Sequence, residues 1–251
     1  MSTGLIATNE WRRQAVQAFA WGLAAAVLVL MAWQFLVALG AYLQIAPKLG
    51  ALPNAPGVTD LVAIPLLRSF SNLLLLVVPL LTMRTFAGER QLRTLPLLLA
   101  AGAGDLRIVL GKFLGTLPLA LILIALVAAM PLSLAFGTTL DLGKLAAAAL
   151  GLALFAAALV AIGIACSAWV AQPALAAGLA VAIGGALSVL DLGARFEGIG
   201  NSAINWFALP THLEPFLRGI VASVDIAYFL LICAVALALA TRRLQRLRQA
   251  P

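Results

Sequence analysis

The stretch Met83–Lys112, MRTFAGERQLRTLPLLLAAGAGDLRIVLGK, is charged and lies between two nearly uncharged runs. Each of those runs is long enough to cross a bilayer, so the stretch between them must lie outside the hydrocarbon. Its middle, Leu95–Ala101, is apolar again but too short to span a membrane. An apolar segment between basic flanks predicts a surface helix, and we expect a cytoplasmic partner to push on it.

The composition places the rest of the chain in a membrane. Of its 251 residues, 64% are hydrophobic and 10% are charged, and the mean hydropathy is +1.10. Soluble domains usually carry about 25% charged residues. A helix needs about 20 apolar residues to cross the hydrocarbon core. We therefore predict an all-α membrane protein in which residues 1–251 form one transmembrane domain, with spans at Ala15–Leu39, Ile64–Met83, Ile108–Leu134, Leu142–Val170, Ala174–Leu190 and Val224–Thr241.

The basic residues are distributed unevenly between the two sides of the predicted membrane. The N-terminal tail, the Met83–Lys112 stretch and the C-terminal tail hold 11 of the 16 basic residues, and the opposite side holds 5. Loops rich in Lys and Arg stay on the cytoplasmic side, so both termini are predicted to be cytoplasmic. The net charge of +7 is thus a topology signal and indicates no nucleic-acid partner.

Thr8 or Asn9 can cap the first span, and no cleavable signal peptide is evident.

Two connections on the predicted outer side differ in character. Pro47–Gly57 holds three prolines and two glycines, which predicts an irregular loop. Asp191–Ser223 is longer and mixes charged with aromatic residues, which predicts an interfacial or re-entrant element.

Within the second connection, Thr211 and Glu214 fit a capping box, and Gly219 is placed to end the helix. We expect this short helix to lean on the fifth and sixth spans, either as a lid or as an anchor for the sixth. Glu214 and Arg218 have the spacing of an ion pair. The apolar face is predicted to hold Leu213, Phe216, Leu217 and Ile220, and the polar candidates are His212, Glu214, Arg218 and Asp225.

The residue types present disfavour several classes of site. Gly104 and Gly111-Lys112 have the wrong spacing for a phosphate-binding loop, so no nucleotide site is predicted. His212 is the single histidine, and no Gly-x-Ser-x-Gly elbow occurs, which disfavours an intramembrane hydrolase. No metal-ligand spacing is present. We therefore predict no catalytic, cofactor-binding or metal-binding residues.

Charges near the span ends are expected to reach an interface. Arg68, Lys112 and Asp225 all lie near such ends and can extend their polar groups by snorkelling. Without a charge deep inside a span, no coupled-ion path is predicted, so the energy must come from elsewhere.

Small residues inside the spans predict close helix packing. Gly151 and Gly163 should let helices approach closely. Cys166 and Cys233 both fall in apolar runs, and we interpret them as small packing residues.

Two blocks of residues resemble those of a known family. The first block comprises Pro79–Arg84, Glu89-Arg90, Thr94-Leu95 with Leu97–Leu99, and Ile108–Phe113. The second comprises His212–Gly219, Asp225 and Tyr228-Phe229. In order and spacing they resemble the membrane subunits of type-2 ABC exporters, and more narrowly the gliding-motility and nitrous-oxide-reductase-maturation group of permeases.

The resemblance implies a multi-pass permease of the bacterial inner membrane that dimerises with a second copy of itself or a related permease. It also implies two cytoplasmic ATPase subunits that bind ATP and Mg²⁺, whereas this chain binds no cofactor. The coupling helix then lies between the second and third spans. The residues expected to couple the two subunits are Arg84, Glu89, Arg90, Arg93, Thr94, Leu95, Leu98 and Lys112.

Two positions of the coupling segment depart from the family pattern. Arg93 stands where the family usually has glycine, and Pro96 where it usually has glutamate. Thr94 as cap with Pro96 in the first turn still allows a helix, because that N–H has no intrahelical partner.

Three hypotheses for the function follow. The first is an ATP-driven exporter subunit without catalytic residues of its own, surrounded by membrane lipids. The second is a non-transporting subunit of the same architecture that passes mechanical work to a periplasmic or lipoprotein partner. The third is an intramembrane enzyme. The predicted cavity lining of generic apolar residues does not identify a cargo.

Overall fold

The computed structural model describes residues 2–49, 57–96, 102–197 and 206–249, and all regular elements among them are helices. Six helical segments are long and apolar enough to cross a membrane, which confirms the predicted fold class. The spanning segments are Ala18–Pro47, Thr59–Gln91, Asp105–Phe136, Leu142–Trp169, Pro173–Leu190 and Ser223–Gln249.

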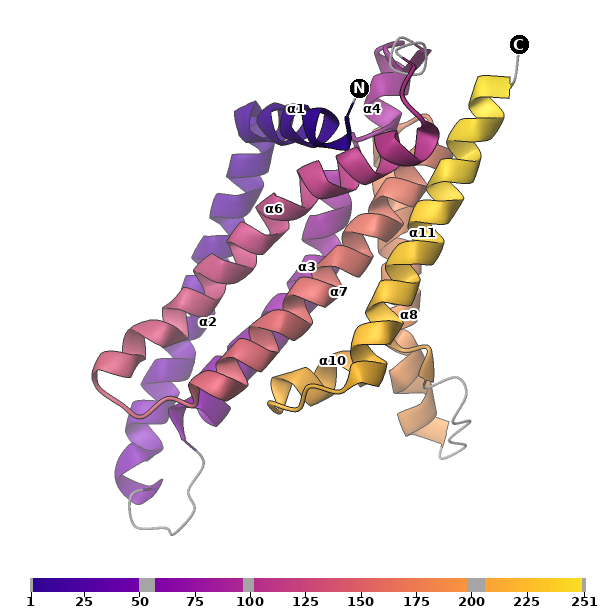
Figure 1. The fold of residues 1–251 in the computed structure, drawn as a ribbon. Helices are drawn as coiled ribbons and strands as arrows, with labels where there is room; N and C mark the ends of the chain where they lie inside the picture. Colours follow the sequence, from indigo (N-terminus) through magenta and orange to yellow (C-terminus); the bar gives the residue numbers. More distant parts are fainter. Residues whose placement is uncertain (1, 50–56, 97–101, 198–205, 250–251) are drawn as a thin grey trace.

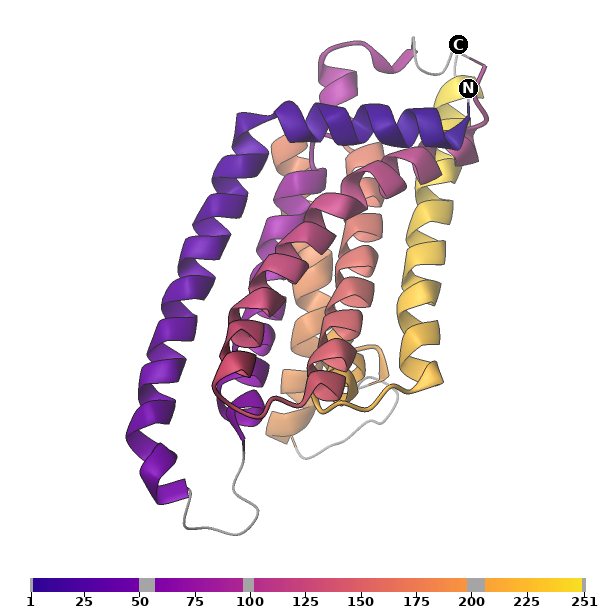
Figure 2. The same ribbon diagram turned by 60° about the vertical axis from the view of Figure 1, so that its left-hand side comes forward.

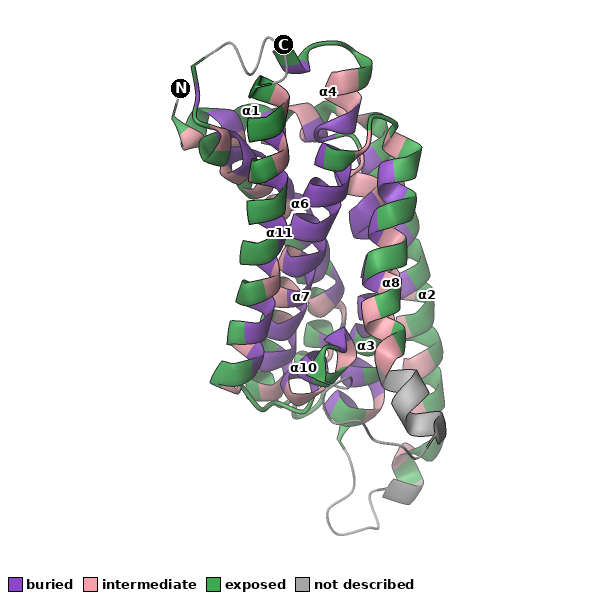
Figure 3. Ribbon diagram, turned by 90° about the vertical axis from the view of Figure 1, so that its right-hand side faces the viewer, coloured by how far each residue is buried: buried purple, intermediate pink, exposed green. Residues whose placement is uncertain are grey.

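The helix α7 (Leu142–Trp169) forms the centre of the bundle. It packs against α3 (Ile64–Thr82), α6 (Asp105–Leu132), α8 (Pro173–Glu197) and α11 (Ser223–Gln249). Figure 3 shows that most of α7 is buried among its neighbours. A helix that is apolar on all sides is stable only when surrounded by other apolar surface, and α7 is such a helix.

Both termini lie at one end of the bundle, together with the short helix α4 (Ala87–Gln91) (Figure 1). We call this the termini end. The opposite end carries the short helix α10 (Leu209–Leu217) and is called the α10 end. The described parts of the Met83–Lys112 stretch therefore lie at the same end as both chain termini, as expected when six spans alternate in direction.

The N-terminal residues form a helix of their own, which the sequence analysis missed. The helix α1 (Thr3–Val16) lies crosswise to α2 (Ala18–Leu49) at the termini end (Figure 2). The prediction that Thr8 or Asn9 caps the first span is wrong, because both residues lie inside α1. The helix α1 is held by its contact with α6, which lies about a hundred residues away in the chain.

Several helix ends differ from the predicted boundaries. The first span continues to Leu49, so Pro47 belongs to a helix and the predicted irregular loop begins later. Residues 50–56 of that loop lie outside the described part of the chain. Pro47 is tolerated because it removes only its own N–H bond close to the helix end. Two short elements complete the chain, the π-helical Thr59–Ala63 (η1) and the 3₁₀-helical Ser133–Phe136 (η2).

The two glycines predicted to permit close packing do so with different partners. A Cβ atom built on Gly163 would lie 2.0 Å from Oγ1 of Thr82, which confirms a close approach of α7 and α3. A Cβ atom on Gly151 would lie 2.4 Å from Cβ of Phe216. Phe216 belongs to α10, so this glycine accommodates the short helix and not a second spanning helix.

The helix α10 begins earlier than predicted and packs mainly on a span that was not predicted. It starts at Leu209 after Ala208, so the predicted capping box with Thr211 as cap is wrong. Its main partner is α7, the fourth span, and it also contacts α8 and α11, the fifth and sixth spans on which it was predicted to lean. Gly219 has φ of 85°, and the N–H of Ile220 bonds to the carbonyl of Pro215, which confirms that Gly219 ends the helix.

The predicted apolar face of α10 is mostly correct. Leu213, Phe216 and Leu217 are buried, whereas Ile220 is exposed because it follows the end of the helix. The predicted spacing of Glu214 and Arg218 gives an ion pair with an Nε–Oε1 distance of 3.2 Å.

Candidate functional site

A buried charge network at the termini end is centred on Lys112. Its Nζ atom donates to Oε1 of Glu89 at 2.5 Å, to Oε2 of Glu10 at 3.1 Å and to the carbonyl of Thr85 at 2.8 Å. These three acceptors use all three hydrogens of the ammonium group. Arg13 adds a second positive charge, with Nη2 at 2.5 Å from Oε1 of Glu10. Two carboxylates and two cations therefore balance within the network.

Lys112 does not reach an interface, so the snorkelling prediction is wrong for this residue. Only 1% of its surface is exposed, and its ammonium group lies 5.0 Å from the ring centroid of Phe86. Burial of an unpaired ammonium ion would be very unfavourable, but two carboxylates compensate it here. One of them, Glu10, comes from α1, a contact that inspection of the third span alone could not reveal.

The helix α1 reaches this network because α6 is narrow where the two helices cross. A Cβ atom on Gly111 would lie 2.7 Å from Cβ of Ile6, and one on Gly115 would lie 2.6 Å from the carbonyl oxygen of Ala7. The four-residue spacing of the glycines places both on one face of α6, with the backbone of α1 directly above them. Lys112 follows Gly111 and points into the crossing.

A serine of α7 holds the turn between α3 and α4. The hydroxyl of Ser167 accepts hydrogen bonds from the backbone N–H groups of Phe86 and Ala87, each at 3.0 Å. It donates to the carbonyl of Met83, also at 3.0 Å. Ser167 is completely buried, so these bonds satisfy backbone groups that water cannot reach. The position of the turn relative to the central helix is thereby fixed.

The backbone at the far end of α4 shows why glycine is usual at the position of Arg93. Arg93 has φ of 55°, in the left-handed region that favours glycine. The N–H of Arg93 bonds to the carbonyl of Arg90, and the N–H of Thr94 to that of Glu89. This is a Schellman ending, whose left-handed position is usually glycine.

The predicted coupling helix is described only at its beginning. Leu95 and Pro96 are helical, and Leu95 is buried. The prediction for Leu98 lies outside the described residues. Arg84, at the start of the segment, is exposed and lies 5.7 Å from the ring centroid of Phe19 in α2.

A second polar cluster lies at the α10 end. Nδ1 of His212 lies 2.6 Å from Oδ1 of Asp225, and Nε2 lies 2.8 Å from the carbonyl oxygen of Trp206. Because a carbonyl oxygen only accepts, Nε2 carries a hydrogen. The imidazole stacks on the ring of Tyr228, with 3.8 Å between centroids. Asp225 is buried, so the snorkelling prediction is wrong for this residue too.

Glu214 joins α10 to α3 at the same end. Its Oε1 atom accepts from Nη2 of Arg68 in α3 at 2.6 Å and from Nε of Arg218 at 3.2 Å. The Arg68 side chain is 53% exposed, in agreement with the prediction that it reaches an interface. Phe216 is completely buried and sits against Gly151. Together with His212, these contacts fasten α10 to α3, α7 and α11.

The two clusters are suited to hold helices together rather than to transform a substrate. The hydrogens of Lys112 and both ring nitrogens of His212 are already engaged with protein acceptors. Sequence reasoning identified Glu89, Lys112 and His212 but missed Glu10 and Ser167. A signal for Glu10 exists, because Ile6, Glu10 and Gln14 recur every four residues and form the buried face of α1. Ser167 has no such signal.

The comparison with known families supplies one match. Residues 64–241 match the family described as ABC-2 family transporter protein. The matched region begins with α3 and ends within α11, so it includes Lys112, Glu89, Ser167 and the whole α10 cluster. It leaves out α1, and therefore Glu10. No curated protein matches the chain.

Proposed function

This chain belongs to the ABC-2 family of transporters, and we propose that it couples ATP hydrolysis by a separate cytoplasmic subunit to export across the inner membrane. It is a multi-pass permease component of an ABC transporter. In the proposed complex two ATPase subunits bind ATP and Mg²⁺, and this chain supplies the membrane path together with a second permease. The termini end faces the cytoplasm, as the excess of basic residues there favours.

The observation that carries this proposal is the ion pair between Lys112 and Glu89. The two residues stand on either side of the predicted coupling helix, and their buried pair ties the start of α6 to α4. A force on the segment between them is therefore passed to both helices at once. Ser167 connects the same turn to α7, so the central helix receives the movement as well.

The α10 cluster is the counterpart at the other end of the same helices. The helix α7 contacts α4 at the termini end and α10 at the opposite end. A shift of α7 along or about its axis changes the packing of Phe216 against Gly151. We propose that His212, Glu214, Phe216, Arg218 and Asp225 transmit this shift to the outer surface, where cargo or a periplasmic or lipoprotein partner is engaged.

The two blocks of characteristic residues also support a narrower assignment. They resemble the gliding-motility and nitrous-oxide-reductase-maturation group of permeases. Arg93 departs from that group, and its left-handed backbone agrees with a position where glycine is usual. In this assignment the chain has no catalytic residue of its own.

Leu98→Asp tests the proposed coupling. The complex is purified with its ATPase subunit, and ATPase binding and stimulation are measured separately. An aspartate in an apolar groove is an unpaired buried charge, so we expect the ATPase to dissociate or to lose its stimulation. Leu98→Met, which keeps an apolar side chain, should retain both. Full binding and stimulation with Leu98→Asp would show that the docking site lies elsewhere.

A further inference from the structure

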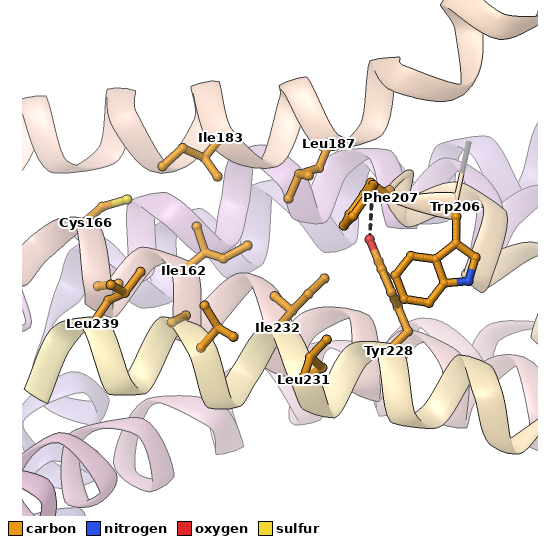
Figure 4. A pocket seen from close by; sticks show the side chains of 13 residues that line it. Ile162, Cys166, Ile183, Leu187, Trp206, Phe207, Tyr228, Leu231, Ile232 and Leu239 are labelled. Atoms are coloured by element: carbon orange, nitrogen blue, oxygen red, sulfur yellow. Dashed lines mark hydrogen bonds between the residues drawn. The ribbon is translucent and has the colours of Figure 1, made fainter. Parts of the chain in front are cut away.

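An apolar groove runs along the bundle between α8 and α11, with α7 as its floor. Its volume is about 330 Å³, and Figure 4 shows side chains of α8 and α11 facing each other across it. At its α10 end the hydroxyl of Tyr228 donates to the carbonyl of Phe207 at 2.6 Å. The groove is lined by Ile162, Ala165, Cys166, Ile183, Leu187, Trp206, Phe207, Tyr228, Leu231, Ile232, Val235, Ala236 and Leu239.

The groove is the size and kind of space that an acyl chain fills. Its walls belong to three segments that span the membrane, and several of its rim residues, such as Leu231 and Val235, are exposed. From Tyr228 to Leu239 it extends about 16 Å along α11 at 1.5 Å per residue. One leaflet of the hydrocarbon core is about 15 Å deep. The length of the groove therefore matches the depth of about one leaflet.

One basic side chain, Arg243, and one aromatic side chain, Trp169, continue the groove at the termini end. Arg243 follows Leu239 by four residues on α11, and Trp169 follows Cys166 by three residues on α7, so both lie on the helix faces that line the groove. The guanidinium carbon of Arg243 lies 5.4 Å from the ring centroid of Trp169. A half-buried second arginine, Arg90 of α4, is repelled by the charge of Arg243.

This pair of arginines has hydrogen-bond donors without acceptors. Nη2 of Arg90 and Nε of Arg243 are both buried, and none of the described residues accepts a hydrogen bond from either atom. A buried charged donor without a partner is unfavourable, and the like charges of the two arginines add repulsion. One anion placed between them would relieve both effects.

We propose that the groove and the Arg90–Arg243 pair bind an anionic phospholipid, with one acyl chain in the groove and the phosphate on the two guanidinium groups. Phosphate oxygens accept several hydrogen bonds at once, and the planar fork of arginine suits them. Trp169 beside the phosphate matches the preference of tryptophan for the membrane interface.

An acidic side chain of a partner protein would satisfy the arginines but not the groove. The groove opens inside the spanning part of the bundle, which a cytoplasmic protein does not reach. The lipid accounts for both features, and its binding does not depend on the ATPase coupling proposed above.

Photo-cross-linking of the purified full chain tests the proposal. The chain is reconstituted in phosphatidylcholine vesicles that contain a trace of phosphatidylglycerol with a photoreactive acyl chain, or of phosphatidylcholine with the same chain. Cross-linked peptides are then mapped by mass spectrometry. We expect the anionic probe to label the groove segments of α7 and α11 about tenfold more than the neutral probe, the ratio for one hydrogen bond to a charged group.

Two matched pairs of variants test the binding of the lipid headgroup and the binding of its acyl chain separately. Arg243→Gln should reduce labelling by the anionic probe to the neutral level, whereas Arg242→Gln, which removes the same charge from an exposed neighbour, should not. Ala236→Phe should fill the groove and abolish labelling with both probes. Ala238→Phe, on the exposed face of α11 outside the groove, should leave labelling unchanged. Melting temperatures of all four variants confirm that they are folded.

Three results would overturn the proposal. Equal labelling by the two probes in the unmodified protein would show that the site does not select an anionic headgroup. Equal losses of labelling by the anionic probe with Arg243→Gln and Arg242→Gln would show that the probe is held only by general charge attraction. Strong competition by inorganic phosphate would indicate a site for a free anion, because free phosphate lacks the acyl chain that the groove is proposed to hold.

Discussion

The Nζ atom of Lys112 lies 2.5 Å from Oε1 of Glu89, and this pair closes the loop that contains the predicted coupling helix. Both side chains are largely shielded from water, with 2% and 14% of their surfaces exposed. A pair at an exposed site would contribute little, but one in this position fixes the spacing between α4 and α6. Any movement of the segment between them must therefore displace both helices or break the pair.

Removal of Lys112 should release that connection. Lys112→Met leaves Glu89 without its closest cation, and loss of one member of a buried pair typically costs about 3–5 kcal/mol. We expect a lower melting temperature and an ATPase that still binds but is no longer stimulated. Arg107→Met, an exposed basic residue of the same helix, should have neither effect.

A double-mutant cycle separates the pair from general packing. Lys112→Met combined with Glu89→Leu removes both charges, and Glu10 keeps its contact with Arg13. The melting temperature should then recover part of the loss, because no unpaired charge remains at Glu89. Stimulation should not recover, since the connection is still absent. Additive losses in melting temperature would contradict the ion pair.

Arg93→Gly should stabilise the segment. Arg93 adopts φ of 55°, where a residue with a Cβ atom carries a strain of about 1–2 kcal/mol and glycine carries none. We expect a higher melting temperature for Arg93→Gly but not for Arg93→Ala, which removes the same charge and keeps the Cβ atom. If both variants lose ATPase stimulation equally, the guanidinium group itself is needed for docking.

Gly163→Ala should disturb the contact between α7 and α3. The added Cβ atom would lie 2.0 Å from Oγ1 and 2.8 Å from Cβ of Thr82, so one helix must move. Overpacking of this kind costs about 1–3 kcal/mol. A drop in melting temperature is expected, whereas Gly178→Ala, with no atom within 4 Å of its added Cβ, should be tolerated. Equal melting temperatures of the two variants would show that the helices are not tightly packed there.

Phe216→Ala and Glu214→Gln separate an anchor from a lid at the α10 end. Phe216 is fully buried against α7, so its loss should cost about 3–5 kcal/mol and reduce the amount of assembled protein. Glu214 pairs with partly exposed arginines, and Glu214→Gln should leave the melting temperature nearly unchanged. A fall in export or partner activation with intact ATP hydrolysis in Glu214→Gln would identify a lid. An unchanged phenotype in both variants would discard lid and anchor together.

Part of the candidate site could be predicted from the sequence. Glu89, Lys112 and His212 stood out because charged and polar residues are rare in this chain. Glu10 was missed because it looks like an ordinary interfacial residue until α1 is placed across Gly111 and Gly115. Ser167 was missed because its role depends on backbone groups of another helix, more than 80 positions earlier in the chain.

The apolar runs of the sequence are sufficient to locate the six spanning segments, because a helix needs about 20 apolar residues to cross a bilayer whatever its neighbours are. The sequence also determined where α10 ends, since Gly219 adopts its positive φ without steric cost. Whether a charge near a span end is buried in the bundle or exposed could not be read from the sequence. Lys112 and Asp225 are buried because Glu10, Glu89 and His212 are brought to them from other helices, whereas Arg68 remains exposed. The free energy of burying a charge depends on its partners in space, and the folded chain alone specifies them.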